Sequence, residues 1–165
     1  MSAILKSLFD FKAWADTELL AAVGGMDGAA HAEAKHTATR ILNHIHTVDK
    51  IFQANVRAEK HTFTATNTPE TPTIEALSWN ALETDRWWQD YVATRSASDL
   101  AQTISFTFTD GDKGQMTREE MLHHVLAHGA YHRGAVGRLV AQTGTPPPRD
   151  LFTKFLHGME PVRRG

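Results

Sequence analysis

The chain has 165 residues, 41% apolar and 22% charged, with a formal net charge of −2 when histidine is neutral. These values are typical of a soluble globular protein, and we expect a single domain over residues 1–165. No lysine- or arginine-rich stripe is present, so nucleic acid is not expected as a partner. Because the chain has no cysteine, disulfides, thiolate metal ligands and a cysteine nucleophile are excluded. We find neither a signal-peptide pattern nor an apolar run of membrane-spanning length, and therefore expect a cytoplasmic protein that does not enter membranes.

Two long helices are predicted in the first part of the chain. Residues 3–23 carry apolar side chains at helical spacing, and Gly24–Gly25 is expected to end this helix. Its predicted inward face consists of Ile4, Leu8, Phe11, Ala15, Leu19 and Val23. A second helix is predicted from about residue 30 to residue 60. His44 lies in its apolar face, whereas His46 is turned by about 200° and is expected to be exposed.

The middle of the chain predicts a loop and a third helix. Residues 61–73 are rich in threonine and lack periodicity, which indicates a loop. Thr71–Pro72 is typical of an N-cap followed by proline at the first helical position, so a helix is expected over about 72–94. Trp79, Trp87 and Trp88 make this helix aromatic, as expected of core packing combined with a subunit contact.

A short hairpin is predicted before the last long helix. Ile104, Phe106 and Phe108 alternate with polar residues, and the turn-rich segment 110–114 follows them. The second strand is expected to be brief, near Gln115–Met116.

The fourth long helix is predicted to begin after a capping box at Thr117–Glu120 and to end before Gly144. A short helix over about 149–158 is expected to cover one end of the core. The predicted fold class is all-α: an antiparallel four-helix bundle with a small β-hairpin inserted before the fourth long helix and a short C-terminal helix.

A metal site is predicted from three histidines. His128 and His132 are four residues apart in the fourth helix, so their rings lie on one face about one turn apart. His44 is the best third ligand from another helix. Three neutral imidazoles suit Zn, Ni or Fe(II) and leave coordination positions open for water or substrate. His124 is open to three interpretations: a ligand, a residue that donates a hydrogen bond to a ligand, or a core residue bonded to a carbonyl.

Asp49 and Arg133 are the weaker candidates for a catalytic role. Asp49 lies one turn beyond His44, and Arg133 follows His132. Each can support a ligand, join an ion pair at the end of the bundle, or contact a substrate. Three glycines in the same helix, Gly129, Gly134 and Gly137, indicate that something approaches its backbone closely, most simply the helix that carries His44.

Three stretches resemble the DinB/YfiT-like family: Phe11–Ala15 in the first helix, Leu42–Ile45 in the second, and His124–Gly134 in the fourth. The last is close to the family signature H-x-x-N-H-x-x-x-H-R-G-Q. Ala127 and Ala135 depart from it, at the positions of the frequent asparagine and glutamine. The resemblance covers essentially the whole chain.

This resemblance implies a four-helix bundle, often a homodimer, with a divalent metal on His44, His128 and His132. It also implies a relation to metal-dependent thiol S-transferases that use bacillithiol, mycothiol or glutathione, and to a thiol-dependent isomerase.

The resulting hypothesis is a metal-dependent thiol S-transferase or hydrolase that acts on a small molecule, with Zn or Ni as the expected ion and Fe(II) as the alternative. Its small-molecule substrates would include a low-molecular-weight thiol, and loop 61–73 and segment 146–156 are expected to frame the entrance. The alternative hypothesis is a metal-binding, stress-responsive module without turnover.

Overall fold

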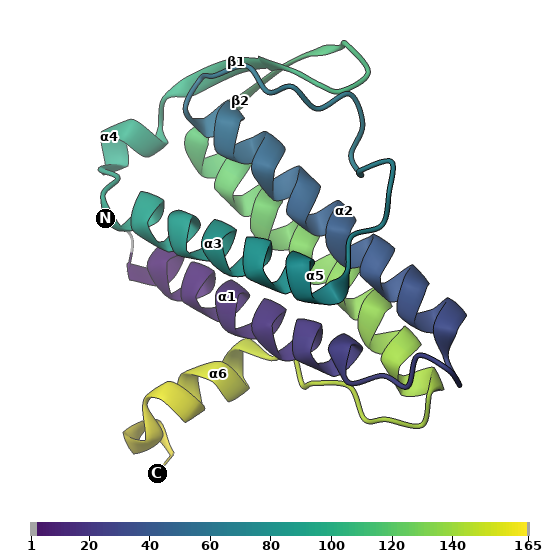
Figure 1. The fold of residues 1–165 in the computed structure, drawn as a ribbon. Coiled ribbons are helices and arrows are strands. Elements are labelled where there is room, and N and C mark those ends of the chain that lie inside the picture. Colours follow the sequence, from purple (N-terminus) through teal and green to yellow (C-terminus); the bar gives the residue numbers. More distant parts are fainter. Residues whose placement is uncertain (1–2, 165) are drawn as a thin grey trace.

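Four long antiparallel helices make up most of the computed structural model, which describes residues 3–164. They are α1 (Ala3–Gly24), α2 (Ala32–Val56), α3 (Ile74–Ala93) and α5 (Arg118–Gln142). The α1 helix packs beside α3, and α2 packs beside α5, so that two helix pairs face each other (Figure 1). The predicted four-helix bundle is confirmed. Among the described helices, none combines the length and apolarity that a membrane crossing requires.

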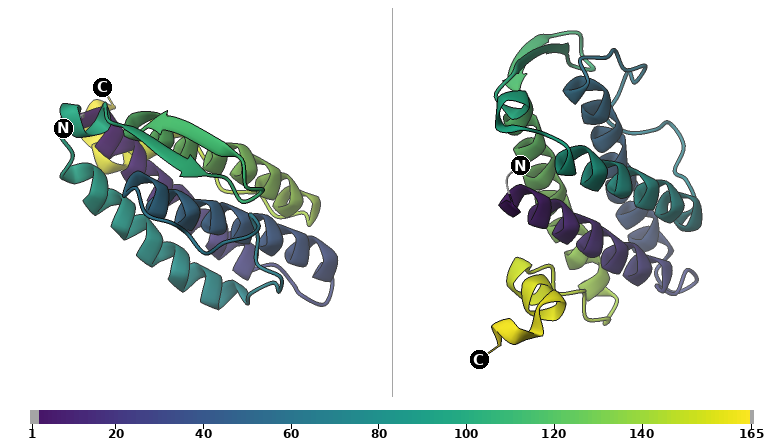
Figure 2. Two further views of the ribbon diagram at one scale, coloured as in Figure 1. Left: turned by 90° about the horizontal axis from the view of Figure 1, so that it is seen from above. Right: turned by 90° about the vertical axis from the view of Figure 1, so that its left-hand side faces the viewer.

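The connection from α3 to α5 contains a short helix, α4 (Ala97–Leu100), and an antiparallel hairpin of β1 (Thr103–Thr107) and β2 (Lys113–Thr117). The hairpin lies over α2 and α5 (Figure 2). After α5 the chain returns along α1 to α6 (Phe152–Met159) and the 3₁₀ helix η1 (Pro161–Arg163). The hairpin and the C-terminal helix are confirmed, whereas α4 and η1 are too short to show an apolar period.

Packing of aromatic rings across the hairpin explains one of its glycines. Phe106 of β1 lies opposite Gly114 of β2. A Cβ on Gly114 would come within 2.8 Å of ring atoms of both Phe106 and Phe108, so any larger residue there would force these rings to move. The second strand spans all of Lys113–Thr117 and is longer than the brief strand expected from the sequence.

Two helix boundaries differ from the predicted ones. The N-cap of α3 is Thr73, whose hydroxyl accepts a hydrogen bond from the backbone N–H of Ala76, so Thr71 is not the cap. The α2 helix ends at Val56 instead of about residue 60, since Ala58 has a φ of +58° and cannot continue a right-handed helix. The predicted start of α5 is confirmed, because Thr117 and Glu120 form a reciprocal capping box.

The interior contains two apolar clusters. The first surrounds Phe9, Trp88 and Leu122 near the hairpin, and the second surrounds Leu19, Leu77 and Val136 at the other end of the bundle. Five charged residues on the four long helices are also almost fully buried, and we call these five the charged layer: Lys12, Asp16, Asp49, Asp85 and Arg133.

Because charged residues of this layer are buried, the inward face predicted for α1 is wrong in the first half of the helix. Lys12 and Asp16 point into the bundle, whereas Ile4, which was expected inside, is 58% exposed. Leu5 and Phe9 are buried in its place. Apolar periodicity misassigns this face because two of the side chains that actually point into the bundle, Lys12 and Asp16, are charged.

Candidate metal centre

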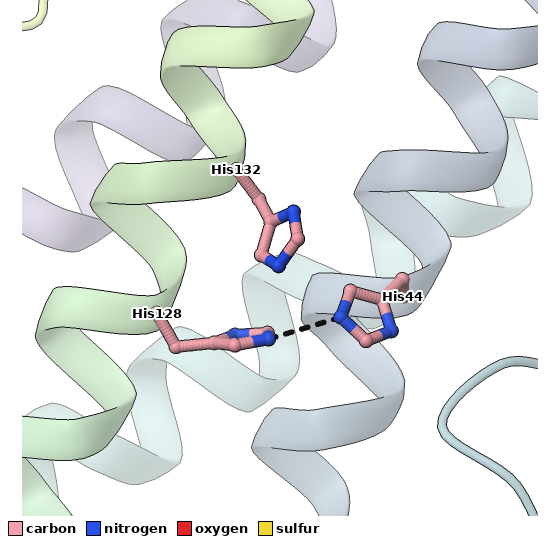
Figure 3. Close-up of side chains that lie close together, drawn as sticks. All are labelled: His44, His128 and His132. Carbon is pink, nitrogen blue, oxygen red and sulfur yellow. Dashed lines mark hydrogen bonds between the residues drawn. The ribbon is translucent and has the colours of Figure 1, made fainter.

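Three histidine side chains from two helices converge beside the bundle interior. His44 comes from α2, and His128 and His132 come from successive turns of α5, with their rings turned toward one another (Figure 3). One ring nitrogen from each lies within 4.8 Å of the others. The shortest approach joins Nε2 of His128 to Nε2 of His44, at 3.0 Å. These three side chains form a group that can hold a metal ion.

A backbone carbonyl sets the tautomer of His44. Nδ1 of His44 lies 2.7 Å from the carbonyl oxygen of Thr66, and a carbonyl can only accept, so this nitrogen carries the proton and donates it. When only Nδ1 carries a proton, Nε2 presents its lone pair toward His128. A hydrogen bond from the far nitrogen to a carbonyl is the usual support of a metal-binding histidine.

The loop that supplies this carbonyl is fixed to α2 by side-chain hydrogen bonds. Asn43 donates to the side chains of Asn67 and Thr68, and Arg40 donates to the carbonyl of Thr68. Asn67 in turn donates to the carbonyl of Arg40. Loop 57–73 is thus held against the helix turn that carries His44, and the orientation of this ring is built into the fold.

The imidazoles on α5 are held neutral. Burial, reinforced by the neighbouring His132 and His44, lowers the pKa of His128 to about 3. Burial and His44 also lower the pKa of His132. Neutral imidazole is the form that coordinates metal. Nδ1 of His128 is buried without a hydrogen-bond partner among the described residues, so no protein group fixes the tautomer of this ring from that side.

The spacing of the nitrogens suits a divalent ion. Two nitrogens about 2.05 Å from zinc in a tetrahedral arrangement lie roughly 3.3 Å apart, close to the 3.0 Å between His44 and His128. The third ligand, His132, has its ring centroid 4.6 Å from that of His44 and 4.5 Å from that of His128. The three rings are therefore close enough together for one divalent ion to be held by a nitrogen from each.

The group lies at the edge of the bundle, and the expectation that His44 belongs to the apolar inward face is wrong. All three ligand candidates are partly exposed, and on α5 the neighbouring residues Ala127 and Tyr131 are exposed. The core face of α5 is a different one, defined by Val125, Gly129 and Val136. An open edge gives a small molecule direct access to the three rings.

His124 is not part of the group of three. Its ring stacks on Phe52 with centroids 4.5 Å apart and on His128 at 5.6 Å. Because His124 is exposed, the interpretation as a core residue is wrong, and its contact with His128 is ring stacking and not a hydrogen bond.

His46 faces away from the other histidines, as predicted, but the expectation that it is exposed is wrong. Its side chain packs against α3, where Nε2 lies 3.2 Å from the hydroxyl of Thr84. Burial, with a contribution from Lys50, lowers its pKa to about 4. Because α2 contacts α3 as well as α5, two of its faces are covered, and apolar periodicity marks only one.

Asp49, the first of the two weaker candidates, lies in the charged layer. Nζ of Lys12 is 2.7 Å from carboxylate oxygens of both Asp16 and Asp49 and 2.6 Å from one of Asp85. These three aspartates also have oxygens within 4.8 Å of one another. The ammonium group already sits among them, in the place where a cation would bind, so the acidic group needs no metal ion. The sequence analysis did not identify this cluster.

Arg133, the second weaker candidate, is held by two carboxylates on the α1 side of α5. Its Nε is 2.7 Å from Asp150 and its Nη1 is 3.1 Å from Asp16. Its neighbour in sequence, His132, faces α2 instead. Arg133 therefore joins the C-terminal segment to the bundle. Segment 146–156 therefore lies on the side of α5 that faces α1, away from the three histidines. Of the two segments expected to frame an entrance, only loop 61–73 lies beside a candidate metal ligand, His44.

The glycines of α5 also reflect this arrangement. A Cβ on Gly129 would come within 3.2 Å of Nη1 of Arg133 and 4.0 Å of Lys12, and one on Gly137 would contact Pro147. Gly134 has nothing within 4 Å. The prediction of a close approach is thus correct at Gly129, where Ile45 of α2, the helix that carries His44, comes as close as Lys12, at 4.0 Å, and Arg133 comes closer.

Protonation within this layer gives a testable pH effect. Burial, only partly offset by Lys12, raises the pKa of Asp85 to about 7. From the unfolded value near about 3.9 up to about 7, the native state keeps a proton that the unfolded chain releases, so this group's contribution to the free energy of unfolding falls as the pH rises. The neutral amide in Asp85→Asn does not titrate. The free energy of unfolding of Asp85→Asn minus that of wild type should therefore rise as the pH increases from about 4 to about 7, by up to a few kcal/mol.

The measurement is a series of urea unfolding curves for both proteins across this pH range. Comparison with a variant removes the contribution of the neutral histidines, whose lowered pKa values act in the opposite direction. Asp90→Asn, which changes an exposed carboxylate on the same helix, is the control and should show no such trend. A stability difference between Asp85→Asn and wild type that is constant with pH would contradict the assignment.

The model of the DinB family matches residues 1–163. Among curated proteins, none matches the chain significantly.

Proposed function

We propose, from the premise that the chain belongs to the DinB family, that it is a metal-dependent enzyme that transfers a low-molecular-weight thiol to a small electrophile. His44, His128 and His132 hold the ion, with Zn or Ni as the first choice and Fe(II) as the alternative. The observation that carries the proposal is the convergence of three imidazoles, one of them oriented by the carbonyl of Thr66, at an open edge of the bundle.

The donor set favours an anionic substrate. Three neutral ligands leave the positive charge of a divalent ion uncompensated, and such an ion lowers the pKa of a thiol or water bound in an open position. The chain has no cysteine of its own, so a reacting thiol must come from solution. Hydrolysis, with water in the place of the thiol, is the alternative reaction at the same residues.

A row of aromatic rings leads from the three histidines through the core to the hairpin, where a cavity can take the rest of the substrate. His124 stacks on Phe52 at 4.5 Å, and Phe52 lies 6.2 Å from Phe106. Phe106 in turn lines a cavity of about 520 Å³ between the hairpin and the first part of loop 57–73. Lys60 and Lys113 also line it and can bind carboxylates of a thiol.

The assembly proposed for the protein is a cytoplasmic homodimer that contacts neither nucleic acid nor membrane. The support for a subunit contact is an exposed apolar pair on the outer face of α3, where Trp79 is 64% and Leu82 is 37% exposed. Light scattering of wild type and of Trp79→Glu tests this, because a dimer through α3 should dissociate when the charge is introduced.

The test of activity is adduct formation between an electrophile, 1-chloro-2,4-dinitrobenzene, and glutathione, cysteine or coenzyme A in separate reactions. We expect zinc- or nickel-loaded wild-type protein to accelerate at least one of them, and chelator or His128→Ala to remove the acceleration. The control is His46→Ala, which changes a histidine of the same helix as His44 that faces α3. Equal rates in loaded, chelated and His128→Ala protein would leave a metal-binding module without turnover.

A further inference from the structure

The α3 helix packs against α1 and α2 and turns one side away from the bundle (Figure 2). Four exposed residues follow one another along this side, at spacings of four, three and four positions: Glu75, Trp79, Leu82 and Arg86. Such spacing keeps side chains on one face of a helix, and we call these four residues the outer stripe. Trp79 is 64% and Leu82 is 37% exposed. The middle of the stripe is therefore apolar, and its two ends carry opposite charges.

A cavity of about 370 Å³ lies beside the stripe, between α1 and α3. Glu75, Trp79 and Leu82 line it, together with residues of α1. The charged groups of its lining are the carboxylates of Glu75 and Asp85, and Asp85 is already bound by Lys12 at 2.6 Å. An exposed indole beside a free carboxylate suits a cation, above all a planar guanidinium that can stack on the ring. The cavity therefore fits the side chain of an arginine.

The arginine at the other end of the stripe cannot fill this cavity within its own chain. Arg86 follows Glu75 by eleven positions, which is about 16 Å along the helix axis. Neither residue forms a side-chain hydrogen bond or ion pair with another residue in the described part of the chain. Glu75 and Arg86 have the same midpoint in the sequence as Trp79 and Leu82. A two-fold axis through that midpoint therefore places Glu75 opposite Arg86 of the partner subunit, and Trp79 opposite Leu82 of the partner subunit.

We propose that two copies of the chain associate through the outer stripe, with their α3 helices antiparallel about this two-fold axis, and that Arg86 of each copy enters the cavity of the other. The guanidinium pairs with Glu75 beside Trp79, and Trp79 packs against Leu82 of the partner subunit. This arrangement rests on the homodimer proposed above and names the residues that form it.

Charge selects this arrangement over two others. Parallel helices would set Glu75 against Glu75 and Arg86 against Arg86, and like charges that face each other repel. A small organic cation could enter the cavity, but it would leave Arg86 without a carboxylate and Leu82 exposed. A second copy satisfies both ends of the stripe and its apolar middle at once, as the same patch on both partners of a two-fold contact requires.

The test exchanges the charges at the two ends of the stripe and measures the dissociation constant of the dimer by sedimentation equilibrium on chelator-treated protein. Glu75→Arg makes both ends positive, and Arg86→Glu makes both ends negative. Each variant should therefore dimerise at least about tenfold more weakly than wild type. The double variant, Glu75→Arg with Arg86→Glu, should recover the affinity of wild type, because each charge again faces an opposite one.

A mixture of the two single variants gives a second readout. In equal amounts, Glu75→Arg and Arg86→Glu should form a heterodimer more tightly than either forms a homodimer, since both pairs of charges are then opposite. The control is Glu18→Arg, which makes the same change of charge at an exposed position of α1 outside the stripe and the cavity lining, and it should dimerise as wild type does.

A wild-type dimer that neither single variant weakens, or a double variant as weak as the single ones, would overturn this arrangement and leave the homodimer itself standing. Wild-type protein that stays monomeric at every concentration would overturn both. Since all samples are metal-free, the result does not depend on the proposed transferase activity.

Discussion

Lys12→Met is expected to destabilise the protein by about 3–5 kcal/mol at neutral pH, the usual cost when one partner of a buried ion pair is removed. The residue is 1% exposed, and its ammonium group contacts Asp16, Asp49 and Asp85 within 2.7 Å. Methionine preserves much of the packing but leaves these carboxylates without their common cation. A loss of this size is a large part of the stability of a typical domain. Urea unfolding followed by circular dichroism measures it.

Acid should partly rescue this variant. Burial raises the pKa values of Asp49 and Asp85 to about 6 and about 7, so both carboxylates become neutral on mild acidification and no longer need a cation. The stability difference between Lys12→Met and wild type should therefore shrink toward about pH 5. Adding Asp49→Asn and Asp85→Asn to Lys12→Met should recover stability at neutral pH for the same reason.

The control is Lys6→Met on the same helix. Lys6 also pairs with an aspartate, Asp10, at 2.7 Å, but its side chain is 50% exposed. Exposed pairs contribute about 0–1 kcal/mol, so this variant should unfold almost as wild type does. If both lysine variants lost equally little stability, or if Lys12→Met gained nothing from acid, the charged layer would not contribute as described.

The sequence alone was sufficient to predict the residues of the candidate site. The i,i+4 spacing of His128 and His132 depends only on helical geometry, and the capping box at Thr117 fixes where that helix begins. His44 could be paired with them because two antiparallel helices bring residues far apart in the chain together.

Burial of charge could not be predicted in this way. Hydrophobic periodicity assigns every lysine and aspartate to the surface, so Lys12 and Asp16 displaced the predicted inward face of α1 and Asp85 was not considered. The stability of such residues inside depends on partners from three different helices, which a local pattern does not contain. The expectation that His46 is exposed was wrong for a related reason. The α2 helix is covered by both α3 and α5, so the side opposite its apolar face is not open to solvent.

Position on α5 separates the two sets of polar residues. His132 and Arg133 are adjacent in sequence, yet the first faces α2 at the open edge and the second faces α1 and the charged layer. Substitutions in the histidine group should therefore alter metal binding without exposing buried charge. This separation makes the metal effect measurable on folded protein.

Zinc is expected to stabilise wild-type protein, and His44→Ala, His128→Ala or His132→Ala should each abolish this effect. An ion that binds only the folded state stabilises it by about 2.7 kcal/mol at a hundredfold excess over Kd. For a chain of this size that corresponds to a rise in Tm of roughly 5–10 °C. Chelator should reverse the rise without loss of helix, because the two apolar clusters do not involve the three histidines.

His46→Ala is the matched control for these variants. It removes an imidazole two residues from His44, on the face of α2 that contacts Thr84. Its own Tm can differ from that of wild type, but its zinc-induced shift should be the same, and calorimetric titration should give one ion per chain. A zinc-induced shift that survives in any of the other three variants would show that the ion binds elsewhere. Unfolding of wild type by chelator would instead make the ion part of the structural core.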